Sequence, residues 1–268
     1  MSKKALIVDK DIFFVEFFSG ILEARGYEVS RAYDGKEGVA KLQEGPVDLL
    51  VVDMVMPKID GSLLIKFARA KYPNEPFLTI TAVSGTLVEQ AGELEAIGAD
   101  YYIAKGPRKQ MGNYLQSWLD TIEDRVPSES ERCDILTPER VYPRRTTMEL
   151  IERLTFSRSI IENLPVGVIV VDRDGRVINM NTKAEEITNK SIAEVLNQHA
   201  TCAFEKYDRD AVVESLKEVV TDVDVPRASF WATLGSIQVR VLVSLLKING
   251  DIAGWILCLD NMQVNEED

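Results

Sequence analysis

Five short, mostly apolar runs separated by helical segments constrain the fold of the first 125 residues more than any other feature of this 268-residue sequence. The runs cover residues 5–8, 27–32, 49–52, 77–80 and 101–104, and only the second is mixed in character. Parallel strands that are covered by helices on both faces are apolar throughout rather than alternating. Helical spacing occupies residues 12–25, 35–44, 61–71, 87–97 and 108–123. We therefore expect a doubly wound α/β domain with a five-stranded parallel sheet over residues 1–125.

The pattern changes after residue 125. Three prolines and a group of polar residues interrupt any periodicity over residues 126–146, which predicts a linker. Thr146, with Glu149 three residues later, forms a capping-box signature, and apolar residues at heptad-like spacing follow it. These features predict a connecting helix over residues 147–163. This helix either packs on the domain that follows or pairs with a second protomer in a short parallel coiled coil.

The last hundred residues have the pattern of an α+β domain. Strands are expected at 166–171, 177–180, 227–234, 237–248 and 252–259, with helical segments near 182–196 and 208–221 between the second strand and the third. A glycine-containing turn joins the first two strands, and Asn249-Gly250 is a strong hairpin signal between the last two. An antiparallel sheet with helices inserted after its second strand is quite unlike the first half of the chain.

Composition excludes several classes of function. The chain has 43 acidic against 31 basic residues, a net charge of −12, so it offers little prospect of a basic face for nucleic acid. His199 is the only histidine, which excludes multi-histidine metal sites and a phosphoaccepting histidine set in a kinase dimerisation helix. The cysteines, Cys133, Cys202 and Cys258, form no CxxC pair. No stretch approaches a secretory signal or the roughly 20 apolar residues that cross a bilayer. We expect a cytoplasmic protein with no membrane and no nucleic-acid partner.

Polar residues follow several of the predicted strands of the first domain. Asp9 and Asp11 follow the first strand, Asp53 ends the third, Thr81 ends the fourth, and Lys105 ends the fifth. The carboxyl ends of parallel strands meet at one edge of a sheet, where ligands bind. Converging carboxylates need a cation among them, and oxygen ligands suit Mg²⁺. A central carboxylate can act as a nucleophile towards a phosphoryl group, while a hydroxyl and an ammonium bind the phosphoryl oxygens.

Residues 1 to about 122 resemble a response-regulator receiver domain, which has a flavodoxin-like fold. The resemblance rests on Leu6–Asp11, Asp48–Gly61 and Gly98–Lys105, in this order and at this spacing. It implies that Asp53 is the phosphoacceptor.

The same resemblance implies roles for the residues around the phosphoacceptor. Mg²⁺ would be bound by Asp9, Asp11, Asp53 and the carbonyl of Val55. Thr81 would be the switch hydroxyl, Tyr102 the aromatic side chain that changes rotamer with it, and Lys105 the phosphate partner.

The sequence departs from the receiver pattern at two places. Lys10 stands where the resemblance implies a second adjacent acid, and Gly106 separates Lys105 from Pro107. An ammonium beside Asp53 would interact with it by roughly 4 kcal/mol at about 4 Å under an effective dielectric of about 20. We therefore expect Lys10 to compete with Mg²⁺, with Asp11 as a substitute ligand if the loop adjusts. The alternative is a Lys10 side chain that points to solvent and has no bearing on the site.

Residues 155–262 resemble a PAS domain, through Asn163–Asp172, Asp174–Asn181 and Asn249–Asp260. Such domains sense ligands or cofactors, or dimerise and transmit a signal through flanking helices. No PAS cofactor is identified: Cys202 lacks the surrounding motif of flavin-linked sensors, and His199 precedes the long helix on which haem-binding members carry theirs. Trp231 and Trp255 are expected in the core rather than in a ligand cage. Residues 263–268 form a short tail.

Three functional hypotheses follow. In the first, the chain is a two-component response regulator that accepts a phosphoryl group on Asp53 from a histidine kinase or phosphotransfer protein. Its output would then be a downstream protein target or a homodimer through the PAS domain and connecting helix, because no output motif is recognised. In the second, Lys10 replaces the metal in a phosphorylation-independent scaffold. In the third, the PAS domain is a small-molecule sensor. None is an enzyme beyond slow self-dephosphorylation.

Overall fold

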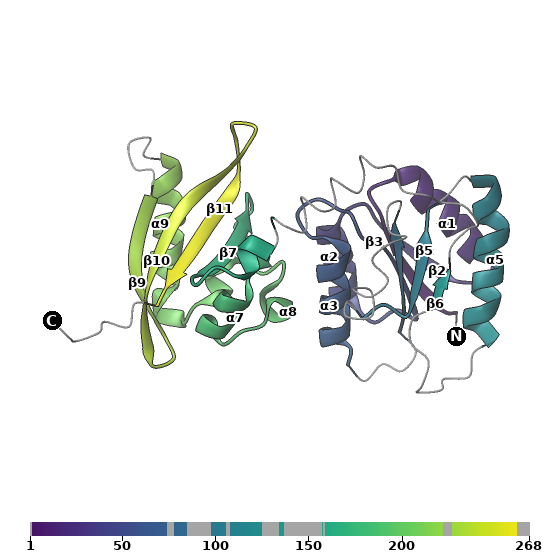
Figure 1. The fold of residues 1–268 in the computed structure, drawn as a ribbon, viewed down its shortest axis with the longest axis horizontal. Helices are drawn as coiled ribbons and strands as arrows, with labels where there is room; N and C mark the ends of the chain where they lie inside the picture. The colour runs from purple at the N-terminus through teal and green to yellow at the C-terminus, as the bar shows by residue number, and fades with distance from the viewer. Residues whose placement is uncertain are drawn as a thin grey trace. The chain divides into compact units, whose positions relative to one another are not determined.

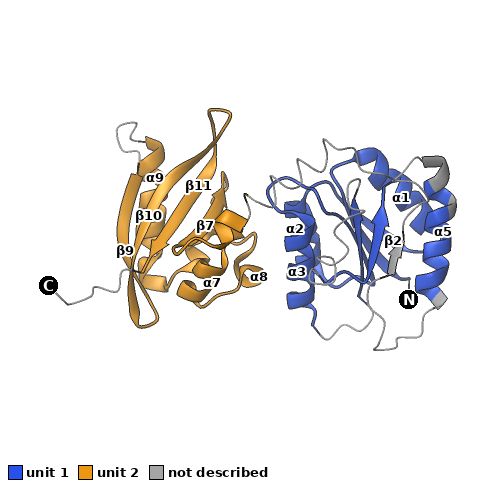
Figure 2. Ribbon diagram, viewed as in Figure 1, with its two compact units in different colours: residues 1–151 blue, residues 152–268 orange. Residues whose placement is uncertain are grey.

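The structure is a computed structural model that describes residues 2–73, 78–84, 98–105, 108–124, 134–136, 157, 159–221 and 227–261. The chain divides into two compact units, residues 1–151 and 152–268 (Figure 2). The helix expected over 87–97, the Gly106-Pro107 step and most of the expected linker and connecting helix lie outside the described residues. No helix in the described ranges is long and apolar enough to span a bilayer.

The first unit is a parallel sheet with helices on both faces (Figure 1). Its strands lie in the order β2-β1-β3-β4-β5-β6. The elements are β1 (Lys4–Val8), α1 (Ile12–Ala24), β2 (Glu28–Ala32), α2 (Gly35–Glu44), β3 (Leu49–Asp53), α3 (Gly61–Lys71), β4 (Thr79–Ser84), β5 (Tyr101–Ala104), α5 (Arg108–Asp124) and β6 (Asp134–Leu136). The predicted doubly wound fold and its five parallel strands are confirmed. Figure 1 shows α2 and α3 on one face of the sheet and α1 and α5 on the other.

Two details of this sheet differ from the sequence-based expectation. Residues 134–136, which were expected in the linker, add a sixth short strand beside β5. The fourth strand begins two residues later than predicted and runs to Ser84. Thr81 is therefore its third residue and not its end. The small residues after Thr81 contribute little to an apolar count, but all are buried, so the strand continues through them.

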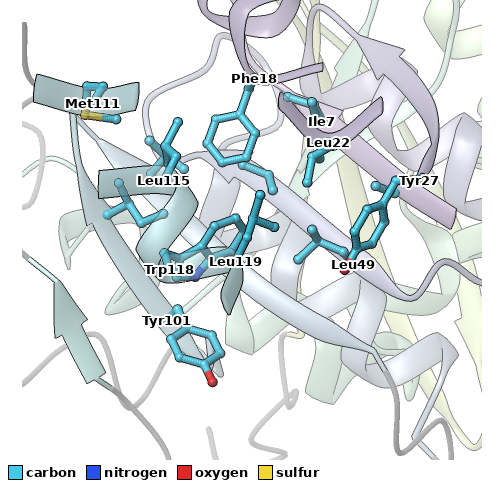
Figure 3. Close-up of a cluster of buried hydrophobic side chains, with 14 of the residues drawn as sticks. Ile7, Phe18, Leu22, Tyr27, Leu49, Tyr101, Met111, Leu115, Trp118 and Leu119 are labelled. Atoms are coloured by element: carbon cyan, nitrogen blue, oxygen red, sulfur yellow. The ribbon is translucent and has the colours of Figure 1, made fainter. Parts of the chain in front are cut away.

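An aromatic and aliphatic core holds the first unit together between the sheet and helices α1 and α5 (Figure 3). Trp118 of α5 is almost fully buried, and its ring meets Phe18 of α1 edge-on, with 5.7 Å between centroids. Ile7 of β1 and Leu49 of β3 belong to the same cluster. Each large buried side chain stabilises the fold by about 2 kcal/mol. The cluster fixes β1 and β3 side by side, and the ends of these two strands carry the candidate site.

The second unit is an antiparallel sheet in the order β8-β7-β11-β10-β9, with helices after its second strand (Figure 1). Its elements are β7 (Gly167–Asp172), β8 (Val177–Met180), α7 (Thr182–Thr188), α8 (Ile192–Val195), the short 3₁₀ helices η1 (Ala200–Ala203) and η2 (Lys206–Asp208), α9 (Arg209–Thr221), β9 (Arg227–Leu234), β10 (Ile237–Ile248) and β11 (Asp251–Asp260). The predicted α+β architecture is confirmed.

Local conformation in this unit follows its turn residues. Asn249 and Gly250 both have positive φ, 52° and 91°, as the tight turn between β10 and β11 requires. The predicted helical segment 182–196 is divided into α7 and α8 at Asn189, whose left-handed conformation ends α7. Ser191 and Glu194 then begin α8 with a capping box.

Candidate functional site

The candidate site lies where β1, β3 and β5 end at one edge of the parallel sheet. Asp9 directly follows β1, Asp53 is the last residue of β3, and Lys105 directly follows β5. The two aspartates are deeply buried, with 1% and 3% of their surface exposed. Tyr102 of β5 and Thr81 of β4 are also buried. The strand order thus places residues that are far apart in sequence around Asp53.

Lys105 connects the two buried carboxylates. Its Nζ atom lies 2.6 Å from Oδ2 of Asp9 and 3.4 Å from Oδ1 of Asp53. The same ammonium stands 4.7 Å from the centroid of the Phe14 ring on α1. A cation between two carboxylates offsets their mutual repulsion, and the aromatic face adds a further favourable contact. Sequence reasoning missed Phe14, since only the α1–β5 geometry brings it to Lys105.

Lys10 approaches Asp53 from the other side. Its Nζ atom donates a hydrogen bond to the carbonyl oxygen of Val55 at 2.5 Å and lies 3.9 Å from Oδ2 of Asp53. Half of the Lys10 side chain remains exposed. The structure therefore places its charged end in contact with the site, although the side chain as a whole is half-exposed.

Asp11 serves helix α1. Its Oδ1 atom accepts hydrogen bonds from the backbone N–H groups of Phe13 and Phe14, at 3.0 and 3.4 Å, as an N-cap residue does. Its own backbone N–H donates to Oδ1 of Asp9 at 2.9 Å. An aspartate directly before a helical segment is the ordinary signal for a cap. That signal was present in the sequence, but we had assigned Asp11 to the metal.

The donor set does not fit Mg²⁺ as the residues are arranged. The carbonyl of Val55 accepts from Lys10, the carboxylate of Asp11 caps α1, and Asp9 is paired with Lys105. In the described part of the chain, no group of three or more acidic, histidine or cysteine side chains could hold a metal ion. Mg²⁺ requires near-octahedral oxygen coordination and is usually bound through one or two carboxylates and several waters. The candidate ligands of this site already contact an ammonium group or cap a helix, so an ion would have to displace those contacts.

The electrostatics of Asp53 reflect its burial. Desolvation raises the pKa of Asp53 above its usual value, with a further increase from Asp9, while Lys105 is the main opposing influence. The backbone N–H of Val55 donates to its Oδ1 atom at 3.4 Å. A carboxylate that is desolvated and flanked by two ammonium groups can act as a nucleophile towards an electrophilic phosphorus atom.

Two buried hydroxyl groups belong to β4, the neighbour of β3, and to β5, the strand beyond it. The hydroxyl of Thr81 is buried and makes no hydrogen bond to any described group. Burial also raises the pKa of the Tyr102 hydroxyl, which keeps it protonated. A buried hydroxyl without a partner costs free energy, and the Thr81 hydroxyl lies on the strand next to the one that Asp53 ends.

Gly61 allows helix α3 to begin directly against the end of β3. A Cβ atom at this position would come within 2.8 Å of the Cα atom of Met54 and closer still to the carbonyl of Asp53. Any side chain here would push α3 away from the loop that follows Asp53. The glycine thus determines how tightly this loop is held.

The rim of the site is apolar. Ile12 and Phe13, at the start of α1, have 59% and 71% of their surface exposed, and Val55 is 44% exposed. These residues follow directly on the charged residues of the site in sequence. Exposed aromatic and aliphatic side chains of this size are common where another protein binds.

The candidate residues of the second unit have structural roles. His199 caps η1, with its Nδ1 atom 2.9 Å from the Thr201 hydroxyl. The indole N–H of Trp255 donates to the carbonyl of Leu216. Trp231 is 58% exposed, so its expected place in the core is wrong: it lies on β9 at a position that alternates with the buried Ala228 and Ala232. A cavity of about 320 Å³ adjoins Trp255 and His199 beside α9.

Comparisons with known proteins agree with this architecture. Residues 5–113 match the family model of the response regulator receiver domain, and residues 155–245 match that of the PAS fold. The alkaline phosphatase synthesis transcriptional regulatory protein PhoP of Bacillus subtilis is 37% identical over 136 residues, which are 50% of this chain and 55% of that protein. The uncharacterized transcriptional regulatory protein YcbL of the same species is 35% identical over 100 residues, 37% of this chain and 43% of that protein.

Solved structures are similar to part of the chain. A CheY-like response regulator receiver domain protein from Methanospirillum hungatei is 30% identical; the match covers 46% of this chain and 98% of that one, with a TM-score of 0.39. This chain spans only about half the length of the two curated relatives above.

Proposed function

We propose that this chain, which carries a response regulator receiver domain followed by a PAS fold, accepts a phosphoryl group on Asp53 and passes the signal on through its PAS domain. One observation carries the proposal: a buried carboxylate stands between two ammonium groups, and a buried hydroxyl without a partner lies on the neighbouring strand. That combination provides a nucleophile and the groups that bind phosphoryl oxygens.

The transfer itself requires little from the protein beyond position and charge. An oxygen of Asp53 attacks the phosphorus atom of a phosphohistidine or a small phosphoramidate. The new O–P bond forms as the P–N bond breaks, and the leaving nitrogen keeps the electron pair and takes a proton. Lys10 and Lys105 stand where they can neutralise the added phosphoryl charge. The chain is in this proposal a phosphoacceptor and not an enzyme.

The proposed donor is a histidine kinase or phosphotransfer protein. Support comes from the rim of Ile12, Phe13 and Val55, whose apolar side chains are exposed and follow Asp11 and Asp53 closely in sequence. A protein donor that covers this rim would bury apolar area and bring its phosphohistidine to the carboxylate.

The proposed response begins at Thr81. A phosphoryl group on Asp53 gives the Thr81 hydroxyl an acceptor, and Tyr102 on the adjacent strand moves with it. The PAS domain then binds a downstream protein target or a second copy of the chain.

The test is phosphorylation of the full-length chain with phosphoramidate or acetyl phosphate, followed by intact mass. We expect the mass of one phosphoryl group to be added to the wild type and none to Asp53→Asn. Asp34→Asn is the matched control, because asparagine caps α2 as well as aspartate does. Wild-type protein that gains no mass, or gains it equally in Asp53→Asn, would contradict the proposal.

A second candidate function is a phosphorylation-independent scaffold. The hydrogen bond from Lys10 to the Val55 carbonyl favours it, because this contact ties the loop after β1 to the loop after β3 in one conformation. The scaffold predicts that neither donor modifies Asp53 and that partner binding is the same for the wild type and Asp53→Asn.

A further inference from the structure

Lys10 makes the contacts in this site that a bound cation would make. The ammonium donates to the carbonyl oxygen of Val55 at 2.5 Å and stands 3.9 Å from Oδ2 of Asp53. Both oxygen atoms belong to the short segment that ends β3. An ammonium is a compact point charge with three donors, so it can satisfy a carbonyl and a carboxylate together.

The other acidic side chains around Asp53 are already engaged. The Asp11 carboxylate accepts two backbone N–H groups at the start of α1. Asp9 accepts the backbone N–H of Asp11 through one oxygen and pairs with Lys105 through the other. A divalent ion would have to displace an ammonium and uncap a helix in order to collect three protein ligands.

The charges of the site balance without a metal ion. The two buried carboxylates, Asp9 and Asp53, face two ammonium groups, Lys10 and Lys105. A divalent ion added to this set would stand beside the Lys10 ammonium, and this like-charge contact opposes binding. Replacing Lys10 by an acid would turn this repulsion into an attraction and would add a ligand for the ion.

We infer that the Lys10 ammonium is the resident cation of this site, so that it takes the place of a divalent metal ion and Asp53 is phosphorylated without one. This inference rests on the proposed function in treating Asp53 as the phosphoacceptor. It specifies what supplies the positive charge there: the chain itself. Phosphorylation of this receiver is then insensitive to the concentration of divalent metal.

The first test measures metal binding directly, with Mn²⁺ as the probe and its free concentration read by electron paramagnetic resonance. We expect the full-length wild type to bind no Mn²⁺ at millimolar concentration, and Lys10→Asp to gain affinity by about tenfold or more. Lys66→Asp is the matched control, since it makes the same charge change on the exposed face of α3. Wild-type binding as tight as that of Lys10→Asp would overturn the inference.

Lys10→Met guards against a Lys10→Asp variant that does not fold. It removes the ammonium and leaves the Val55 carbonyl free, without adding a ligand. We expect its Mn²⁺ affinity to lie between those of the wild type and Lys10→Asp. An affinity unchanged from the wild type at full folding, judged by circular dichroism, would contradict the role of Lys10.

The second test compares the rate of phosphorylation by phosphoramidate in EDTA and in Mg²⁺. We expect the wild-type rate to change by less than about twofold and the Lys10→Asp rate to rise by about tenfold or more with Mg²⁺. A wild-type rate that rises as steeply would overturn the inference. If the wild type is never phosphorylated, the proposed function fails, while the Mn²⁺ titration still decides whether Lys10 holds the cation position.

Discussion

In the PAS fold, the buried side chain of Asn181 accepts two backbone N–H groups and donates to two backbone carbonyls, at 2.8 to 3.1 Å. In the receiver domain, the equally buried hydroxyl of Thr81 makes no hydrogen bond to any described group. The amide of Asn181 satisfies all of its hydrogen-bonding capacity within the native fold, whereas Thr81 carries a cost that the folded state alone does not recover.

This contrast extends to the charged groups. Asp172 of the PAS fold accepts two N–H groups in the turn that follows it, and Asp208 accepts the N–H of Thr233. Burial of Asp53 in the receiver carries a desolvation cost for its ionised carboxylate. Lys10 and Lys105 offset only part of that cost. Substitution can therefore distinguish two kinds of buried polar group. Replacing a group that stabilises the fold should lower the free energy of unfolding, whereas replacing one that serves a function should leave it unchanged or raise it.

Asn181→Ala should produce the largest change in the free energy of unfolding. The Val168 N–H and the Val166 carbonyl lose the partner that the Asn181 side chain provides, while the Ala184 N–H and the Ile161 carbonyl keep a backbone hydrogen bond. We therefore expect the PAS fold to lose about 3 kcal/mol of unfolding free energy. Hydrogen exchange of the PAS strands in the full-length chain measures it. Phosphorylation of Asp53 should be unchanged, and a change there would break the separation of structural and functional polar groups.

Lys105→Met should destabilise the receiver by about 2 kcal/mol near neutral pH, because Asp9 and Asp53 then face each other with only the half-exposed Lys10 nearby. The loss should shrink in acid as the Asp53 carboxylate is protonated. Urea unfolding at both pH values checks this. An equal loss at both would mean that the lysine stem, and not its charge, stabilises the site.

Asp53→Asn should stabilise the receiver, and by less than Lys105→Met destabilises it. Since burial raises the pKa of Asp53 in the folded state, the native protein holds that proton to higher pH than the unfolded chain does. The ionised carboxylate is therefore a net cost near neutral pH, and we expect Asn to raise the midpoint of thermal unfolding. The difference should vanish below the usual aspartate range, where both side chains are neutral. A loss of stability at neutral pH would mean that the Asp53 carboxylate stabilises the fold, as Asn181 does.

Glu194→Ala should have the smallest effect, about 0.5 kcal/mol, since the capping box of α8 is exposed. Hydrogen bonds from Ser191 lower the pKa of Glu194, so its contribution is present above the ordinary glutamate range and is lost as the pH falls through the folded-state value. Thermal unfolding at neutral and acid pH measures the difference. Glu194→Gln is the control, because its amide can still accept the same bonds.

The fold was predictable wherever the hydrophobic pattern and the turn or capping residues indicated the same element. Six elements were placed to the residue, since Gly, Asp or Asn marks at least one end of each: the strands at 101–104, 177–180, 227–234 and 237–248 and the helices at 35–44 and 61–71. The fourth receiver strand was misplaced because Ala82 and Ser84 are buried without being strongly apolar. Trp231 was misassigned because residue type was weighed above its place in the alternation of β9.

The site was predictable as a set of strand ends and less so as a set of contacts. Strand order brings Asp9, Asp53 and Lys105 together, and that order follows from the α/β pattern. The partner of each side chain depends on rotamers and loop paths, which leave no periodic signal. Thus Asp11 was expected near a metal and is found as a helix cap. The Lys10 contact with Val55 requires the loops after β1 and β3 to be adjacent, which only the folded structure shows.

The sheet order of the second unit has a consequence for the time at which each domain can fold. Strand β7 lies between β8 and β11, and its residue Asp172 pairs with Gly254 of β11. During synthesis, β7 emerges from the ribosome long before β11, so one of its edges stays open until the last strand has been made. In the receiver, β1 pairs with β3, and only α1, β2 and α2 lie between these two strands in the sequence. We expect the receiver to fold during translation and the PAS fold to wait for its final strand, which makes the unpaired edge of β7 the point where a nascent chain is most exposed to aggregation.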